Sequence, residues 1–317
     1  MKYRKNEAKQ YAREHMRGIW AAALNPMLPD FSIDEAGLRQ NIAHWVDDLK
    51  IQGLFIAGKQ GEFFSMTVAE RKRNFEVAVQ ACGDRASTIM SCSDQNFDTV
   101  IELAKHAQAI GADYIVVHAP VLHFIHDREE TLLNYYKTIC DEVDIGIALW
   151  SHPDSGYLMS PQLCRQLADL PNIVAIKYSV PREMYSELSR LAGETLLVST
   201  ASEDEWLDNL IELDWRLYLC SSPPYLLQSR HDLRMHEYTE LAFAGRHDEA
   251  RKVSASLAPV RQALKSTRPG GKPQAHQKVW QSLLGQAGGP VRPPLLQMTE
   301  PEIAATREAF KACGLKV

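Results

Sequence analysis

Eight short apolar runs, separated by stretches with helical spacing, constrain the fold of this chain more than any other feature. Each run has the length of a buried strand, and several are rich in Val and Ile. Eight strands that alternate with helices favour a closed parallel (β/α)8 barrel, the TIM-barrel fold of the α/β class. The runs lie at residues 18–24, 53–57, 88–92, 114–119, 146–150, 173–178, 196–200 and 217–220.

The stretches between the runs carry helix signals. Residues 98–110 place apolar side chains at helical spacing, and Gly111 stands where a helix would end. Residues 160–170 do the same, with Ser160 as the expected N-cap and Pro161 at the first helical position. These signals fit the crossover helices of parallel βαβ units.

A doubly wound open sheet is the alternative fold. It predicts a glycine-rich phosphate loop after the first strand, but residues 24–27 read Leu-Asn-Pro-Met. We therefore expect a charged N-terminal segment at 1–17, a barrel at 18–225 and a C-terminal helical extension at 226–317. Gly/Pro-rich breaks divide this extension at 269–273 and 288–294. We expect it to pack on the barrel or on a neighbouring subunit.

The composition narrows the class of protein. The net charge is −5 and no basic block is present, so the sequence gives no electrostatic support for nucleic-acid binding. The N-terminus lacks a signal-peptide core, and the apolar run at 19–24 is too short to span a bilayer. Six cysteines are scattered without a CxxC pair, which is typical of reduced thiols. We expect a cytoplasmic protein with no membrane partner.

Lys177 is the residue most suggestive of chemistry. It lies in the apolar sixth run, near the strand end where barrel enzymes place their reactive groups. Burial lowers the pKa of a lysine and makes its amine nucleophilic toward carbonyls. The alternative is a lysine at the strand end that reaches solvent or forms an ion pair.

The segment 170–179, Leu-Pro-Asn-Ile-Val-Ala-Ile-Lys-Tyr-Ser, resembles the Schiff-base strand of the dihydrodipicolinate synthase/N-acetylneuraminate lyase superfamily. Further segments agree with that superfamily in order and spacing over residues 18–317. They are Gly-Lys-Gln-Gly-Glu at 58–62, Met-Thr at 66–67, Glu-Arg at 70–71, Gly-Ala-Asp at 111–113, Pro120, Pro153 and Arg-Pro-Pro-Leu at 292–295. The resemblance implies a homo-oligomeric barrel in which Lys177 attacks a 2-oxo acid, usually pyruvate.

The chain departs from the family pattern at the positions that move protons and bind substrate. Trp150 stands where the family has its relay tyrosine, and an indole does not shuttle protons near neutral pH. Residues 121–122 are Val-Leu in place of a tyrosine pair, and residues 153–157 lack the arginine of the synthases. Lys59 and Gln60 replace two threonines of the carboxylate loop. These departures argue against a dihydrodipicolinate synthase or a sialic acid lyase.

Two histidines are candidates for the missing relay. His152 shares a strand face with Trp150, and His118 lies near the end of the fourth run, but both also fit loop or packing roles. His123 and His126 follow in the next loop, yet no carboxylate is grouped with these histidines, so we predict no metal site.

The other predicted site residues bind substrate. Lys59 is expected to hold a carboxylate or to lower the pKa of Lys177, the alternative being a solvated loop lysine. Gln60 offers amide donors, Trp150 and His118 contact substrate, and Ser221 shapes the pocket at the last strand end. Glu62 is expected to fix its loop rather than to act as an acid.

Together these features predict a Schiff-base-forming lyase, an aldolase or hydratase-aldolase, with Lys177 and His152 as catalytic residues. Its substrates would be pyruvate or another small 2-oxo acid and an uncharged aldehyde, with no metal or organic cofactor. We expect a homo-oligomer, a dimer or tetramer. The alternatives are a 2-keto-3-deoxy sugar acid dehydratase and a catalytically silent barrel that binds a carbonyl metabolite.

Overall fold

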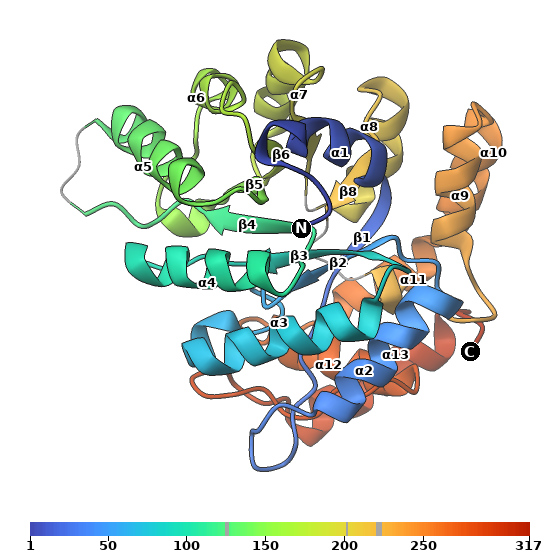
Figure 1. The fold of residues 1–317 in the computed structure, drawn as a ribbon. Coiled ribbons are helices and arrows are strands. Elements are labelled where there is room, and N and C mark those ends of the chain that lie inside the picture. Colours follow the sequence, from blue (N-terminus) through green and yellow to red (C-terminus); the bar gives the residue numbers. More distant parts are fainter. Residues whose placement is uncertain (124–126, 201, 220–223) are drawn as a thin grey trace. The chain divides into compact units, whose positions relative to one another are not determined.

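The computed structural model describes residues 1–123, 127–200, 202–219 and 224–317 (Figure 1). Within them, eight strands follow one another along the chain, each at one of the predicted apolar runs. The strands are β1 Gly18–Ala22, β2 Gly53–Ile56, β3 Ser87–Ser91, β4 Tyr114–His118, β5 Gly146–Ser151, β6 Ile173–Tyr178, β7 Leu197–Ser199 and β8 Leu217–Leu219.

Helices lie between successive strands, as the sequence predicts, and five more follow β8 within the described residues. The α-helices are α1 Ala8–His15, α2 Glu35–Ala43, α3 Val68–Cys82, α4 Phe97–Ala109, α5 Arg128–Glu142, α6 Pro161–Leu167, α7 Arg182–Ala192, α8 Trp206–Glu212, α9 Arg234–Phe243, α10 His247–Ser256, α11 Ala258–Ser266, α12 Pro273–Leu283 and α13 Glu300–Ala312. None of the helices in the described part of the chain is both long and apolar enough to cross a membrane.

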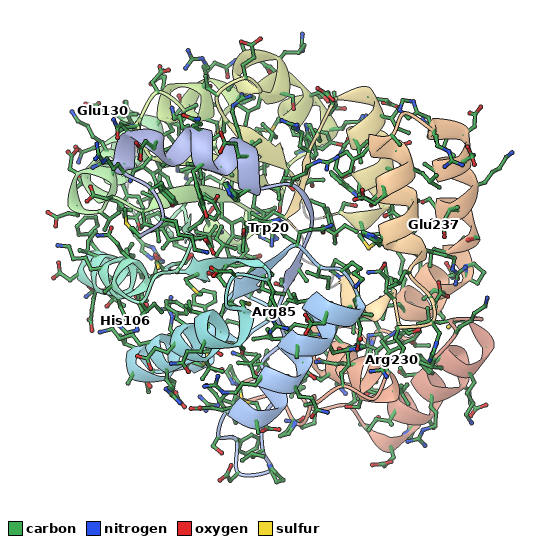
Figure 2. The ribbon with its side chains drawn as sticks, turned by 45° about the vertical axis from the view of Figure 1, so that its right-hand side comes forward. Trp20, Arg85, His106, Glu130, Arg230 and Glu237 are labelled. Carbon is green, nitrogen blue, oxygen red and sulfur yellow. The ribbon has the colours of Figure 1, made fainter. Side chains whose placement is uncertain are left out.

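The chain divides into two compact units. The first comprises Met1–Gly18 and Ser87–Cys220, and the second comprises Ile19–Ala86 and Ser221–Val317. In the first unit, β3 to β7 are neighbours in chain order and run parallel. Helices α4 to α7 connect these strands as parallel crossovers. The side chain of Glu130 on α5 is exposed (Figure 2).

The predicted capping residues Ser160 and Gly111 are found at helix ends of this unit. The Ser160 side chain caps α6 by accepting a hydrogen bond from the Leu163 amide, and Pro161 is the first helical residue. Gly111 has φ of +84° just beyond α4, a conformation that glycine adopts at little cost. The N-terminal segment predicted at 1–17 contains α1, which packs on β5 and β6.

In the second unit, β1 and β2 pair in parallel, with Trp20 opposite Gly53. A side chain at position 53 would start 2.1 Å from the Trp20 ring, so only glycine allows this strand pairing. The same unit holds α2, α3 and α9 to α13. The predicted breaks at 269–273 and 288–294 fall before α12 and between α12 and α13.

A buried histidine in α12 makes the stability of this unit depend on pH. His276 is fully buried, and its Nε2 lies 2.9 Å from the Thr267 hydroxyl oxygen. That hydroxyl donates to the carbonyl of Ala263, so it accepts from the Nε2–H of a neutral His276. Burial, with a smaller contribution from Arg268, lowers the pKa of His276 from 6.5 to about 4.

We therefore expect the free energy of unfolding to fall by about 2 kcal/mol between pH 7 and pH 5 through His276 alone. The unfolded chain takes up this proton below pH 6.5, whereas the folded chain resists it until about pH 4. Urea unfolding of wild type and His276→Gln at both pH values measures the effect. An equal loss of stability in the two proteins would contradict it.

Candidate active site

Four residues occupy the same level on consecutive strands of the first unit. His118 on β4 pairs with Trp150 on β5, Trp150 pairs with Lys177 on β6, and Lys177 pairs with Ser199 on β7. Residues in register on neighbouring parallel strands project to the same face of the sheet. The alignment therefore directs these four side chains to one side, close to the carboxyl ends of their strands.

Lys177 lies against the indole of Trp150. Its side chain is fully buried, and the Nζ atom is 4.9 Å from the centroid of the Trp150 ring. The indole face attracts an ammonium or a cationic iminium. Trp150 thus provides a surface that fits both charged forms of the nitrogen.

His118 also contacts the indole of Trp150. Its ring centroid is 4.8 Å from that of Trp150, in an edge-to-face arrangement. The His118 amide donates a hydrogen bond of 2.9 Å to the Ser93 hydroxyl oxygen, and Ser93 is also 3.4 Å from the Ser91 hydroxyl. Ser93 therefore fixes the backbone that carries the histidine.

His152 follows β5 and completes an aromatic cluster with Trp150 and His118. Its ring centroid is 6.2 Å from Trp150 and 6.4 Å from His118. The Nδ1 atom accepts a hydrogen bond of 3.1 Å from the Asp154 amide, so the neutral ring carries its proton on Nε2. The Asp154 carboxylate lies 3.2 Å from Nδ1 and stabilises the ring when it is protonated.

The second unit carries the loop at residues 58–62, which follows β2. Lys59 and Gln60 are both partly exposed. The Asn25 side-chain amide donates to the Gly61 carbonyl at 2.6 Å, and that of Gln274 donates to the Lys59 carbonyl at 3.2 Å. The buried Oε1 atom of Gln60 has no hydrogen-bond partner among the described residues, so it offers an acceptor to a bound molecule.

The structure thus brings four predicted site residues together in the first unit and places two on one loop of the second. Ser221 and His126 lie outside the described residues. Sequence reasoning assigned no role to Ser93 and missed Asp154. The only signal for Asp154 was its position two residues after His152, at a turn that begins with proline.

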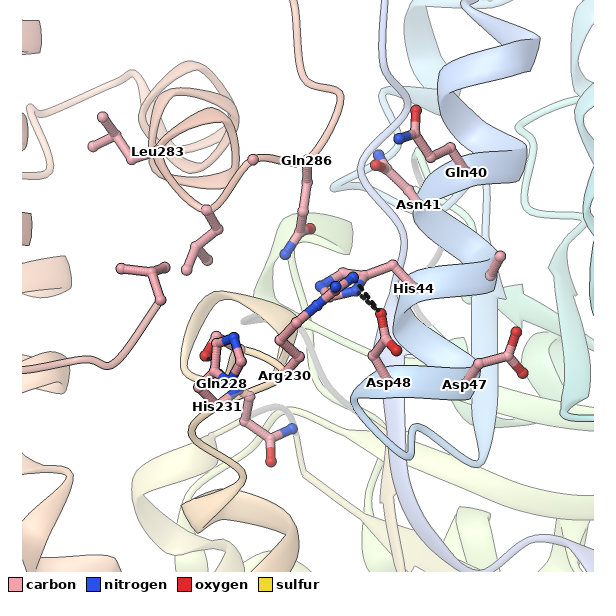
Figure 3. Close-up of a pocket in the computed structure, with 15 residues that line it drawn as sticks. Gln40, Asn41, His44, Asp47, Asp48, Gln228, Arg230, His231, Leu283 and Gln286 are labelled. Atoms are coloured by element: carbon pink, nitrogen blue, oxygen red, sulfur yellow. Dashed lines mark hydrogen bonds and ion pairs between the residues drawn. The ribbon is translucent and has the colours of Figure 1, made fainter.

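No group of three or more His, Cys, Asp and Glu side chains is arranged for metal binding within the described parts of the chain. The second unit has a cavity of about 600 Å³, in which His44 and Arg230 contact Asp48 at 2.6 and 3.0 Å (Figure 3). None of the predicted site residues that the structure describes lines this cavity.

Comparisons with known proteins match this arrangement to one family. The model of the dihydrodipicolinate synthetase family matches residues 15–313. An uncharacterized DapA-like lyase of Thermococcus onnurineus is 31% identical over 202 residues, which cover 62% of this chain and 67% of that protein. An N-acetylneuraminate lyase of Clostridium perfringens is 33% identical over 193 residues, which cover 61% and 66%. The chain thus matches about two thirds of the length of these relatives.

Solved structures extend the likeness to nearly the whole chain. The crystal structure of N-acetylneuraminate lyase from Fusobacterium nucleatum superimposes with a TM-score of 0.83 at 25% identity. It covers 95% of this chain and 100% of that one. The likeness confirms the (β/α)8-barrel fold that the sequence predicts.

Proposed function

Because the chain belongs to the dihydrodipicolinate synthetase family, we propose that Lys177 forms a Schiff base with pyruvate or another small 2-oxo acid. Membership confirms the family expected from the sequence, and with it the enzyme class, a lyase of the class I aldolase type. The observation that carries the proposal is the fully buried Lys177, with its Nζ over the Trp150 indole.

The chemistry follows from the properties of an iminium. The neutral amine of Lys177 adds to the keto carbon, and the carbinolamine loses water to give a cationic iminium. The iminium accepts the electron pair released when the adjacent carbon–carbon bond breaks or when a C3 proton leaves. An aldehyde is the second product or substrate of this step, and neither a metal nor an organic cofactor is needed.

Proton transfer falls to His152 in this proposal. In the protonated ring, Nδ1–H donates to the Asp154 carboxylate, 3.2 Å away, and no longer accepts from the Asp154 amide. Nε2 is then the atom that gives up the proton to the substrate and takes it back. Trp150 cannot perform this step, but with His118 it forms an aromatic wall for an uncharged aldehyde.

Incubation with pyruvate in D2O tests the function directly. We expect the protein to exchange the C3 protons of pyruvate for deuterium, because the iminium and its enamine interconvert by losing and regaining that proton. Proton NMR measures the exchange as loss of the C3 proton signal of pyruvate. Exchange no faster than buffer for a broad panel of 2-oxo acids would favour the silent barrel. Release of water from a 2-keto-3-deoxy sugar acid, without exchange of pyruvate, would favour the dehydratase.

Lys59→Met is expected to raise KM for the 2-oxo acid by about 10- to 100-fold, the value of a hydrogen bond to a charged group. We propose that Lys59 and Gln60 bind the substrate carboxylate. The variant should also weaken the salt dependence of kcat/KM. Lys105→Met removes an exposed lysine that pairs with Glu142 and serves as the control. Equal KM values for the two variants would assign Lys59 to the solvated surface.

We also propose a cytoplasmic homo-oligomer, a dimer or tetramer. The five cysteines in the described residues are free thiols, and all are buried, which suits a reducing compartment. Light scattering should give a multiple of 35.7 kDa, and a monomer would contradict the oligomer.

A further inference from the structure

We propose that Lys278 is a positioning residue, which holds the substrate-binding loop at residues 58–62 in place through a buried ion pair with Glu62. The inference rests on the proposed function, in which Lys59 and Gln60 of this loop bind the carboxylate of the 2-oxo acid. Lys278 lies 216 residues from Glu62 in the sequence, in the middle of α12.

The ion pair is enclosed by protein, and each member makes a further hydrogen bond to the backbone. The exposed fractions of the Glu62 and Lys278 side chains are 0% and 1%, and Oε1 lies 2.6 Å from Nζ. The Lys278 ammonium also donates to the Pro290 carbonyl at 2.7 Å, and the second Glu62 oxygen accepts from the Arg292 amide at 2.8 Å. The pair therefore connects the loop to both α12 and the segment after it.

The loop backbone needs such an anchor. Ala57 and Glu62, which flank the loop glycines, have φ of +51° and +60°. Side-chain-bearing residues adopt this left-handed region at a cost, and they stay there only when their surroundings hold them. For Glu62, the surroundings are the ammonium of Lys278 and the amide of Arg292.

A second contact ties the same loop to the same helix. Gln274 lies one turn before Lys278 on α12, so the two side chains share a helix face. Gln274 donates to the backbone carbonyl of Lys59, the residue proposed to bind the carboxylate. One face of α12 thus contacts the loop at Lys59 and at Glu62.

Because both charges of the pair are buried, the loss of either one should disturb the loop. Desolvation lowers the pKa of Lys278, and the neighbouring Glu62 counteracts it. A buried charge that loses its partner is strongly unfavourable, so removing either member should displace the loop rather than leave it unchanged. Removing both, with the volume kept, leaves no stranded charge.

Lys278→Met is the direct test, with Lys272→Met as the matched control. Lys272 directly precedes the same helix and pairs with Glu302 of α13 at 2.7 Å, not with the loop. Hydrogen exchange without substrate should become at least about tenfold faster at the amides of residues 58–62 in Lys278→Met. KM for the 2-oxo acid should rise by about tenfold or more, with a smaller change in kcat. Lys272→Met should leave both values unchanged.

If Lys278→Met does not fold, the double variant Glu62→Gln/Lys278→Met is measured in its place. It should fold and still show the faster loop exchange and raised KM, since the anchor is gone. Unchanged loop exchange in a folded variant would overturn the proposal whatever the activity. If wild type exchanges the C3 protons of no 2-oxo acid, the proposed function is wrong, while loop exchange still decides the role of Lys278.

Discussion

Lys177→Met should lower turnover of the 2-oxo acid to background, a loss of more than about 10⁴-fold in kcat. The thioether fills much of the same volume but has no nucleophilic nitrogen, so neither the carbinolamine nor the iminium can form. The fold should remain intact, because the substitution removes a fully buried amine and adds no unpaired charge.

Steady-state kinetics measure the expected loss of kcat, and thermal unfolding shows whether the fold is intact. Lys105→Met, which removes an exposed lysine of α4, provides the control and should retain wild-type kcat. If Lys177→Met folds and keeps substantial turnover, Lys177 is a packing residue and the chemistry lies elsewhere.

His152→Asn should lower kcat by about 10² to 10⁴, the usual contribution of a general acid–base group. The substitution is well matched to the local structure. The asparagine Oδ1 takes the place of the imidazole Nδ1 and can accept the same hydrogen bond from the Asp154 amide. The turn after β5 is thereby kept, and the titratable proton is the main loss.

The pH profile separates this role from a structural one. The limb of the kcat profile that reports His152 should disappear in the asparagine variant, while imine formation at Lys177 survives at least in part. His118→Asn is the comparison, since His118 contacts the same indole. Near-normal kcat and an unchanged profile for His152→Asn would move the relay to His118.

The sequence predicts the strands well because a buried parallel strand has a simple signal, a short apolar run. Residues 173–178 were predicted as the sixth strand and form β6 without a change of bounds. Helix ends are predicted less well. The helix predicted at 160–170 ends at Leu167, because Pro171 disfavours a helical conformation at Leu170 and a turn closes before it.

The site was predictable in part for the same reason. His118, Trp150 and Lys177 each stand near the carboxyl end of a run, and parallel pairing aligns such positions. The bond from the Asp154 amide to His152, and the ion pair of Glu62 with Lys278, leave no such signal. A helix pattern does not show which buried lysine meets a carboxylate more than two hundred residues away.

Borohydride reduction in the presence of pyruvate, followed by mass spectrometry of peptides, tests the central claim most directly. Reduction converts the iminium into a stable secondary amine, so the adduct marks the nitrogen that attacked the carbonyl. We predict a single labelled peptide that contains Lys177, and no label in Lys177→Met. Labelling at another lysine, or no label with any of a broad panel of 2-oxo acids, would contradict the account.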